Sequence, residues 1–217
     1  MGRTRILLVD DHALIREAVA EILQREEDLE VVGTAANADD AIDLARRLCP
    51  NVLVMDIDMG GVDCFDAVRR IRAAQPEVLV LFLSAYAYDH YIERALRVGA
   101  RGYVTKTSSV QMVVAAVREV AAGGACFSPD VQARLVATTS GVTLAAPQHT
   151  RSATLTEREL EVLGYVARGL SKKAIADLMF LSVNTVDRHT TNIRRKLGVR
   201  DRVALTRLAI REGLVHA

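Results

Sequence analysis

Five short aliphatic runs alternate with segments of helical periodicity over the first half of this 217-residue chain. The runs are RILLVD (5–10), LEVVGTA (29–35), NVLVMD (51–56), VLVLFLSA (78–85) and ARGYVTK (100–106). Strands that alternate with amphipathic helices form a parallel sheet, because each helix crosses over the sheet to bring the chain back to the next strand. The alternation therefore predicts a parallel sheet with helices on both faces.

Four of the aliphatic runs end in carboxylate, hydroxyl or ammonium side chains. Asp10 and Asp11 follow the first run, Asp56 ends the third, Ser84 lies near the end of the fourth, and Lys106 ends the fifth. Ligand sites of such sheets lie at the carboxyl ends of the strands. An Asp pair can also cap a helix, but three convergent carboxylates are costly unless a cation joins them. The set therefore favours a Mg²⁺ site that handles phosphate.

Helical periodicity without strands is found in the last third of the chain. LTERELEVLGYVARG (155–169) begins with a capping box formed by Thr156 and Glu159. The segments SKKAIADLMF (171–180) and VNTVDRHTTNIRRKLG (183–198) are separated by a tight turn, which predicts a helix-turn-helix within a four-helix domain. The inner stripe of the longer helix is Val186, Thr190, Ile193 and Leu197. The residues expected to face outward, as base and phosphate contacts, are Asn184, Asp187, Arg188, Thr191, Arg194 and Arg195.

Charge and composition divide the chain in the same way. Residues 1–128 carry five more acidic than basic side chains, whereas residues 154–217 carry five more basic than acidic ones. Such opposition predicts an acidic chemical domain joined to a basic domain that meets a polyanion. Small and hydroxylated residues near the junction favour a linker. We therefore expect a domain at 1–125, a linker with a short helix at 126–153, and a second domain at 154–217.

The carboxylates, hydroxyl and lysine at the strand ends resemble the receiver domain of two-component response regulators. The resemblance covers about residues 3–124 and rests on Asp10, Asp11, Asp56, Ser84, Lys106 and the Tyr103 of GYVTK. It implies a flavodoxin-like, doubly wound sheet of five parallel strands. It also implies a protein without enzymatic turnover beyond accepting and losing its own phosphoryl group.

The resemblance assigns a role to each of these side chains. Asp56 would accept a phosphoryl group from a sensor histidine kinase, while Lys106 and Ser84 would contact phosphate oxygens. Tyr103 would turn inward when Ser84 moves toward the phosphoryl group. The implied Mg²⁺ ligands are Asp10, Asp11, Asp56 and the backbone carbonyl of Asp58.

Two departures and two alternatives accompany this interpretation. Gly60 stands where the family often has Pro, and Cys64 where it often has Gly, so we expect altered autodephosphorylation. The D-x-D spacing of Asp56 and Asp58 is also found in haloacid-dehalogenase-like phosphatases, although there it lies on the first strand. A DNA-binding protein with a vestigial receiver is the other alternative, and the complete acid pair with Lys106 argues against it.

Residues 154–215 resemble the LuxR-type output domain. Together with the receiver domain, this output domain gives the architecture of NarL/FixJ-type response regulators. The resemblance implies double-stranded DNA as partner, read by a homodimer over inverted or direct half-sites. Asp187 stands where many members carry a basic reader, and it would favour the amino group of cytosine. His189 would lie near the DNA backbone or pack in the core. The expected DNA contacts are Lys172, Lys173, Asn184, Thr185, Asp187, Arg188, His189, Thr191, Arg194, Arg195 and Lys196. The expected dimer contacts are Val203, Leu205, Leu208 and Ala209.

Location and redox state follow from the rest of the sequence. No uninterrupted apolar run of about 18 residues occurs and the chain opens MGRTR, so we expect a cytoplasmic protein that does not engage a membrane. The three cysteines are widely spaced and lack a metal-binding pattern. We therefore expect reduced thiols that serve mainly in packing.

Overall fold

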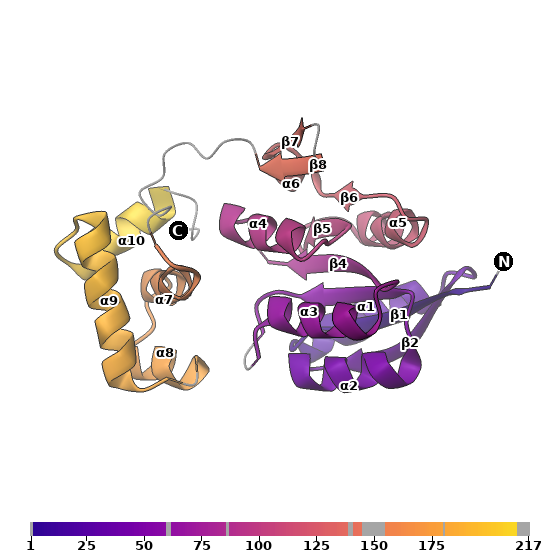
Figure 1. Ribbon diagram of the computed structural model, residues 1–217, viewed down its shortest axis with the longest axis horizontal. Coiled ribbons are helices and arrows are strands. Elements are labelled where there is room, and N and C mark those ends of the chain that lie inside the picture. The colour runs from indigo at the N-terminus through magenta and orange to yellow at the C-terminus, as the bar shows by residue number, and fades with distance from the viewer. Residues whose placement is uncertain are drawn as a thin grey trace. The chain divides into compact units, whose positions relative to one another are not determined.

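The chain folds into two compact units, residues 1–145 and residues 146–217. The first unit combines a sheet with helices, and the second shows helices only in the part of it that the structure describes (Figure 1). The computed structural model describes residues 2–59, 62–85, 87–138, 141–144, 155–179 and 181–211.

A parallel sheet is the centre of the first unit. Its strands run in the order β2-β1-β3-β4-β5-β6. They are β1 (Thr4–Val9), β2 (Leu29–Ala35), β3 (Val52–Asp56), β4 (Leu79–Ser84), β5 (Gly102–Thr105) and β6 (Cys126–Phe127). Strands β1, β3 and β4 are almost continuously apolar and buried, as central parallel strands are. The predicted parallel sheet is confirmed, and β6 adds a strand to the five that the sequence predicts.

Five helices cover the two faces of this sheet. They are α1 (Ala13–Gln24), α2 (Ala38–Leu48), α3 (Cys64–Ala74), α4 (Asp89–Arg97) and α5 (Val110–Ala121). One apolar cluster joins the sheet to α2, α3 and α4, and a second joins it to α1 and α5. Because both faces are occupied by aliphatic side chains, the buried polar residues at the sheet are left at the carboxyl ends of the strands. These are Asp10, Asp56, Ser84 and Thr105, with Ser128 just after β6.

The described residues between 126 and 144 contain a short helix, as predicted for this segment, and also strands, and they belong to the first unit, which therefore extends beyond the predicted boundary at residue 125. After β6 come α6 (Pro129–Gln132) and a hairpin of β7 (Leu135–Thr138) and β8 (Gly141–Leu144). Strand β6 pairs with β5, and Ser128 N donates to Tyr103 O at 3.0 Å. The side chains of Phe127 and Val131 are 8% and 0% exposed in the apolar cluster of the sheet. These elements are too short for their periodicity to be recognised, so tertiary packing determines them.

Four helices form the described part of the second unit: α7 (Glu157–Ala167), α8 (Lys172–Leu178), α9 (Val183–Leu197) and α10 (Arg202–Arg211). Thr156, Ser171 and Ser182 cap the starts of α7, α8 and α9, and α9 ends at Gly198 with φ at 67°. One apolar cluster joins the four helices. The predicted four-helix domain is confirmed, including its capping box.

Within the part of the chain described above, no helix is both long enough and apolar enough to span a bilayer. Cys49, Cys64 and Cys126 are free thiols, the first exposed and the second buried. Burial raises the pKa of the Cys126 thiol, which disfavours the thiolate form.

Candidate functional site

The polar residues predicted from the strand ends come together at one edge of the sheet. Asp10 follows β1, Asp56 ends β3, Ser84 ends β4, and Lys106 follows β5. The side chains of Asp10 and Asp56 are 1% exposed and that of Ser84 is 0% exposed. Parallel strands with covered faces thus deliver these groups to a single, nearly buried cluster.

One lysine serves both buried carboxylates. Lys106 Nζ lies 2.7 Å from Asp56 Oδ2 and 2.7 Å from Asp10 Oδ2. Asp58 N donates to Asp56 Oδ1 at 3.3 Å. Because a single ammonium faces two carboxylates, the cluster retains excess negative charge.

The pKa values reflect this imbalance. Burial raises the pKa of Asp56, and the negative charge of Asp10 raises it further, while the hydrogen bond and charge of Lys106 oppose the rise. Burial alone would lower the pKa of Lys106, but its hydrogen bonds with Asp10 and Asp56 outweigh that effect and raise it. The charged form of Lys106 is therefore favoured, whereas burial and the charge of Asp10 disfavour the ionised form of Asp56.

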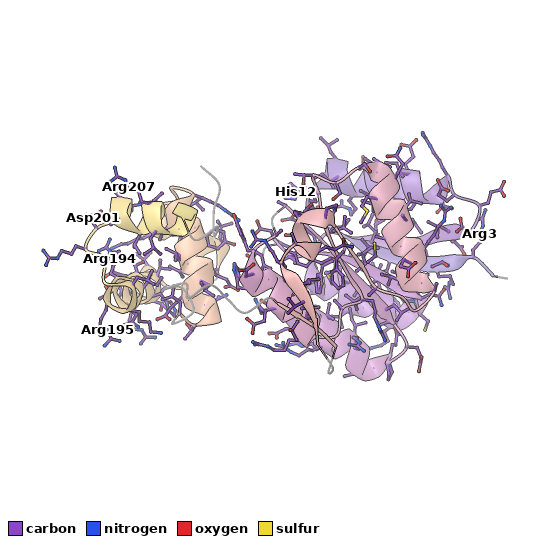
Figure 2. The ribbon with its side chains drawn as sticks, turned by 90° about the horizontal axis from the view of Figure 1, so that it is seen from above. Arg3, His12, Arg194, Arg195, Asp201 and Arg207 are labelled. Carbon is purple, nitrogen blue, oxygen red and sulfur yellow. The ribbon has the colours of Figure 1, made fainter. Side chains whose placement is uncertain are left out.

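A second group of side chains makes the cluster suitable for a cation. Asp10, Asp11, His12 and Asp56 each offer a ligand atom, and these atoms all lie within 4.8 Å of one another. His12, labelled in Figure 2, was not among the predicted site residues; its Nδ1 lies 2.6 Å from Asp11 Oδ1. The adjacency of His12 to the acid pair was the available signal. Three carboxylates with uncompensated charge fit a hard divalent ion.

Ser84 is connected to Tyr103 on the neighbouring strand. The Tyr103 side chain is 0% exposed, and a hydrogen bond joins the two hydroxyls. Burial raises the pKa of Tyr103 far above its usual value. The structure thus places Tyr103 in the inward position that the receiver resemblance associates with a moved Ser84.

The outward face of α9 carries the second set of predicted residues. Asn184, Asp187, Arg188, Thr191 and Arg195 are exposed. The half-buried members of the predicted set are Thr185, His189 and Arg194. Figure 2 labels Arg194 and Arg195. The inner stripe is buried as expected, and Thr190 Oγ1 donates to Val186 O at 2.8 Å. One face of α9 therefore presents donors, acceptors and positive charge to solvent.

Two predicted DNA-contacting lysines have partners within the domain. Lys172, at the start of α8, forms an ion pair with Asp187 on α9. Lys196 Nζ lies 2.6 Å from Glu159 Oε2, and the Glu159 side chain is 4% exposed. Burial tends to raise the pKa of Glu159, but hydrogen bonds with Lys196 and Thr156 hold it below its usual value. Lys196 therefore supports the fold, whereas the Lys172 and Asp187 side chains remain about half exposed.

The predicted dimer contacts on α10 require a correction. Leu205, Leu208 and Ala209 are 0%, 4% and 0% exposed and belong to the core cluster of the domain. Val203 is 61% exposed. Because α10 must bury an apolar stripe to complete the four-helix core, these three residues are unavailable as a surface, and Val203 is the one predicted contact that remains accessible.

Comparison with known proteins identifies the class. The chain matches the family "Response regulator receiver domain" over residues 6–118 and "Bacterial regulatory proteins, luxR family" over residues 153–209. The protein belongs to the response regulators that join a receiver domain to a LuxR-type DNA-binding domain. It is thus a transcriptional regulator of a two-component system.

Individual relatives cover between 61% and 98% of this chain. Response regulator protein VraR of Staphylococcus aureus is 34% identical over 212 residues, which is 98% of this chain and 99% of VraR. A LuxR-family response regulator from Aurantimonas sp. SI85-9A1 is 33% identical, with a TM-score of 0.58 over 61% of this chain and 94% of its own. The response regulator RcsB, solved as a complex with DNA, shares the fold at 20% identity, with a TM-score of 0.58 over 95% of this chain and 98% of RcsB.

Proposed function

We propose that this protein is a DNA-binding transcriptional switch that is controlled by Mg²⁺-dependent phosphorylation of Asp56. The observation that carries the proposal is the cluster in which Asp56, 1% exposed, lies 2.7 Å from Lys106 beside a second buried carboxylate. Asp56 would attack the phosphorus of a phosphohistidine on a sensor histidine kinase. The P–N bond of the donor breaks as the bond from the Asp56 oxygen to phosphorus forms.

The residues around Asp56 would prepare it for this reaction. Asp10, Asp11 and Asp56, with the backbone carbonyl of Asp58, would hold the ion; Mg²⁺ would neutralise the oxygens of the transferred group. Lys106 would exchange part of its contact with the carboxylates for a phosphoryl oxygen, and the Ser84 hydroxyl would donate to another. We propose no turnover of any other substrate.

The output would change by a shift between two populations. Phosphorylation would draw Ser84 toward the phosphoryl group and keep Tyr103 buried. The arrangement of β5 and α4 that goes with a buried Tyr103 would then be favoured over the alternative one. A change from about 1:99 to 99:1 requires about 5.5 kcal/mol of differential stabilisation. The phosphoryl group and dimerisation on DNA would supply it together.

Double-stranded DNA is the proposed partner of the second unit. The outward face of α9 would enter the major groove, with the exposed Asn184, Arg188 and Arg195 among its contacts. RcsB, which shares this fold, was solved bound to DNA. We further propose that the cytoplasmic protein binds as a homodimer over inverted or direct half-sites, in which the exposed Val203 of α10 takes part.

The first experiment is a DNA-binding titration of the full chain. The duplex is a site enriched by in vitro selection, and the wild type is compared with Asp56→Asn, each with and without Mg²⁺ and acetyl phosphate. We expect affinity to rise about 5- to 150-fold in the wild type when both are present, and to stay constant in Asp56→Asn.

A matched variant tests whether the effect belongs to Asp56. Asp66→Asn removes an exposed carboxylate that pairs with Arg69 on α3, and it should retain the full response. Equal affinity of the wild type under all conditions would contradict phosphorylation control and leave a DNA-binding protein with a vestigial receiver.

A further inference from the structure

An acidic side chain lies in the middle of the surface proposed to face DNA. Asp187 is in the second turn of α9 and its side chain is 55% exposed. Its partner is Lys172, the first residue of α8, whose side chain is 51% exposed. The hydrogen bond with Lys172, and then the charges of Lys172 and Arg194, lower the pKa of Asp187, so the carboxylate is ionised at neutral pH.

A carboxylate at this place restricts what it can contact on DNA. It accepts hydrogen bonds only, so the phosphates of the backbone repel it and a base amino group attracts it. In the major groove such groups are cytosine N4 and adenine N6. Adenine places the acceptor N7 beside N6, where it would face the second oxygen of the carboxylate, whereas the cytosine edge has no acceptor of its own. Asp187 therefore suits cytosine.

Lys172 removes the main obstacle to this contact. Without a cationic partner, the negative charge of Asp187 would approach the polyanion uncompensated. The ion pair neutralises the charge and occupies one side of the carboxylate, which fixes its orientation. The adjacent Lys173 is also exposed and forms no ion pair among the residues that the structure describes, so it offers a matched comparison.

We propose that Asp187 selects cytosine at one position of each DNA half-site and that Lys172 is the residue that positions it. This inference rests on the proposed DNA binding. It assigns Lys172 to the reading of one base pair rather than to a phosphate, and it makes the two side chains one recognition unit.

The test is in vitro selection from a random duplex library. The full-length wild type, Asp187→Asn, Lys172→Gln and Lys173→Gln are each selected with Mg²⁺ and acetyl phosphate, and the enriched duplex is then titrated with every base at every position. We expect the wild type to prefer cytosine at one position by about tenfold. Asp187→Asn should move that preference to adenine, because an amide pairs with both N6 and N7.

The two lysine variants separate positioning from simple attraction. Lys172→Gln should flatten the preference at that one position and keep the others, whereas Lys173→Gln should weaken binding to all duplexes and keep every preference. Binding of each variant to unselected duplex at low salt verifies that it is folded.

Three results would overturn part of the scheme, and they can be told apart. Retained cytosine preference in Asp187→Asn would show that Asp187 does not read a base. Identical preference profiles for the two lysine variants would reduce Lys172 to a phosphate contact. A wild type that enriches no sequence at all would refute the sequence-specific DNA binding on which the inference rests.

Discussion

Each unit contains a buried carboxylate that is paired with a lysine, and the two pairs behave in opposite ways. Asp56 lies 2.7 Å from Lys106, and Glu159 lies 2.6 Å from Lys196. Both carboxylates are almost inaccessible to solvent. Nevertheless, the pKa of Asp56 is raised from its usual value and that of Glu159 is lowered.

The difference lies in the other partners of each carboxylate. Glu159 Oε2 also accepts hydrogen bonds from Thr156 N at 2.8 Å and Thr156 Oγ1 at 3.0 Å, which completes the capping box of α7. Asp56 instead shares its lysine with Asp10, and Asp58 N donates to it at 3.3 Å. Donors therefore outweigh burial at Glu159, whereas burial and a neighbouring negative charge prevail at Asp56.

Glu159 is therefore a carboxylate that stabilises the fold, whereas Asp56 is a carboxylate that is suited to bind a metal ion or to react. A satisfied carboxylate has little to gain from a new partner. An under-compensated carboxylate gains from a metal ion or an electrophilic phosphorus, at some cost in stability. Four experiments test this contrast, and the stability of each unit is followed through its calorimetric transition in the full chain.

The largest effect is expected from Glu159→Gln. This change removes the charge that Lys196 and Thr156 bind, so the unfolding transition of the second unit should lose about 2 kcal/mol, or about 10 °C. Glu161→Gln, on the same helix, removes a pair with Arg158 that is more accessible to solvent, and it should cost about 1 kcal/mol or less. Equal shifts for the two variants would show that the more deeply buried pair contributes no more than the more accessible one.

Mg²⁺ should affect the first unit alone. At tenfold excess over its dissociation constant, an ion that binds only the folded state stabilises it by about 1.4 kcal/mol. We expect the corresponding shift in the first transition, its loss on chelation, and a smaller shift in Asp11→Asn. A shift of both transitions in parallel would indicate general salt stabilisation rather than binding at the acidic cluster.

Asp56→Asn should stabilise the protein, in contrast to Glu159→Gln. Replacing the carboxylate by an amide relieves the repulsion from Asp10 and the cost of burying a charge, so the first unit should gain about 1 kcal/mol. The matched change Asp66→Asn, in an exposed pair with Arg69, should leave the transition within about 0.5 kcal/mol. Destabilisation by Asp56→Asn would mean that Lys106 fully compensates the carboxylate.

The smallest effect concerns pH. The folded-state pKa of Asp56 is raised, so the ionised side chain destabilises the folded protein at neutral pH. This destabilisation decreases as the pH falls through the folded-state pKa, and it is gone below the usual pKa of 3.8. The folded-state pKa of Glu159 is lowered, so its contribution to stability is complete above the usual value of 4.5 and is lost as the pH falls through the lower folded-state pKa.

The advantage of Asp56→Asn over the wild type should therefore shrink, by less than about 1 kcal/mol, between pH 7 and pH 4.5. The disadvantage of Glu159→Gln should persist across the same interval. The opposite pattern would reverse the assignment of the two carboxylates.

Much of the receiver could be predicted because its signals are local. An aliphatic strand, a polar residue at its end and an amphipathic helix recur along the first half of the chain. Because the strands are parallel, the polar residues at their ends, Asp56, Ser84 and Lys106, lie at one edge of the sheet. The capping box of α7 was likewise visible in the sequence, since it needs only Thr156 and a Glu three residues later.

The remaining features depend on contacts that are distant in sequence. Lys196 was assigned to DNA because helical position alone does not reveal Glu159, which is 37 residues away. Leu205 and Leu208 were assigned to a dimer interface because an apolar stripe in the sequence does not distinguish packing in the domain core from packing against a second protomer. Strand β6 has two residues, and its pairing with β5 was therefore not recognisable.

The elements after α5 also determine the boundary at which the receiver can be truncated without loss of its fold. A fragment that ends at residue 125 would lack β6 and leave the main-chain groups of β5 as an open edge, ready to pair with another copy. It would also lose Phe127 and Val131 from the apolar cluster. The transferable receiver module is therefore residues 2–144, and a chimera with a different output domain should be joined after β8.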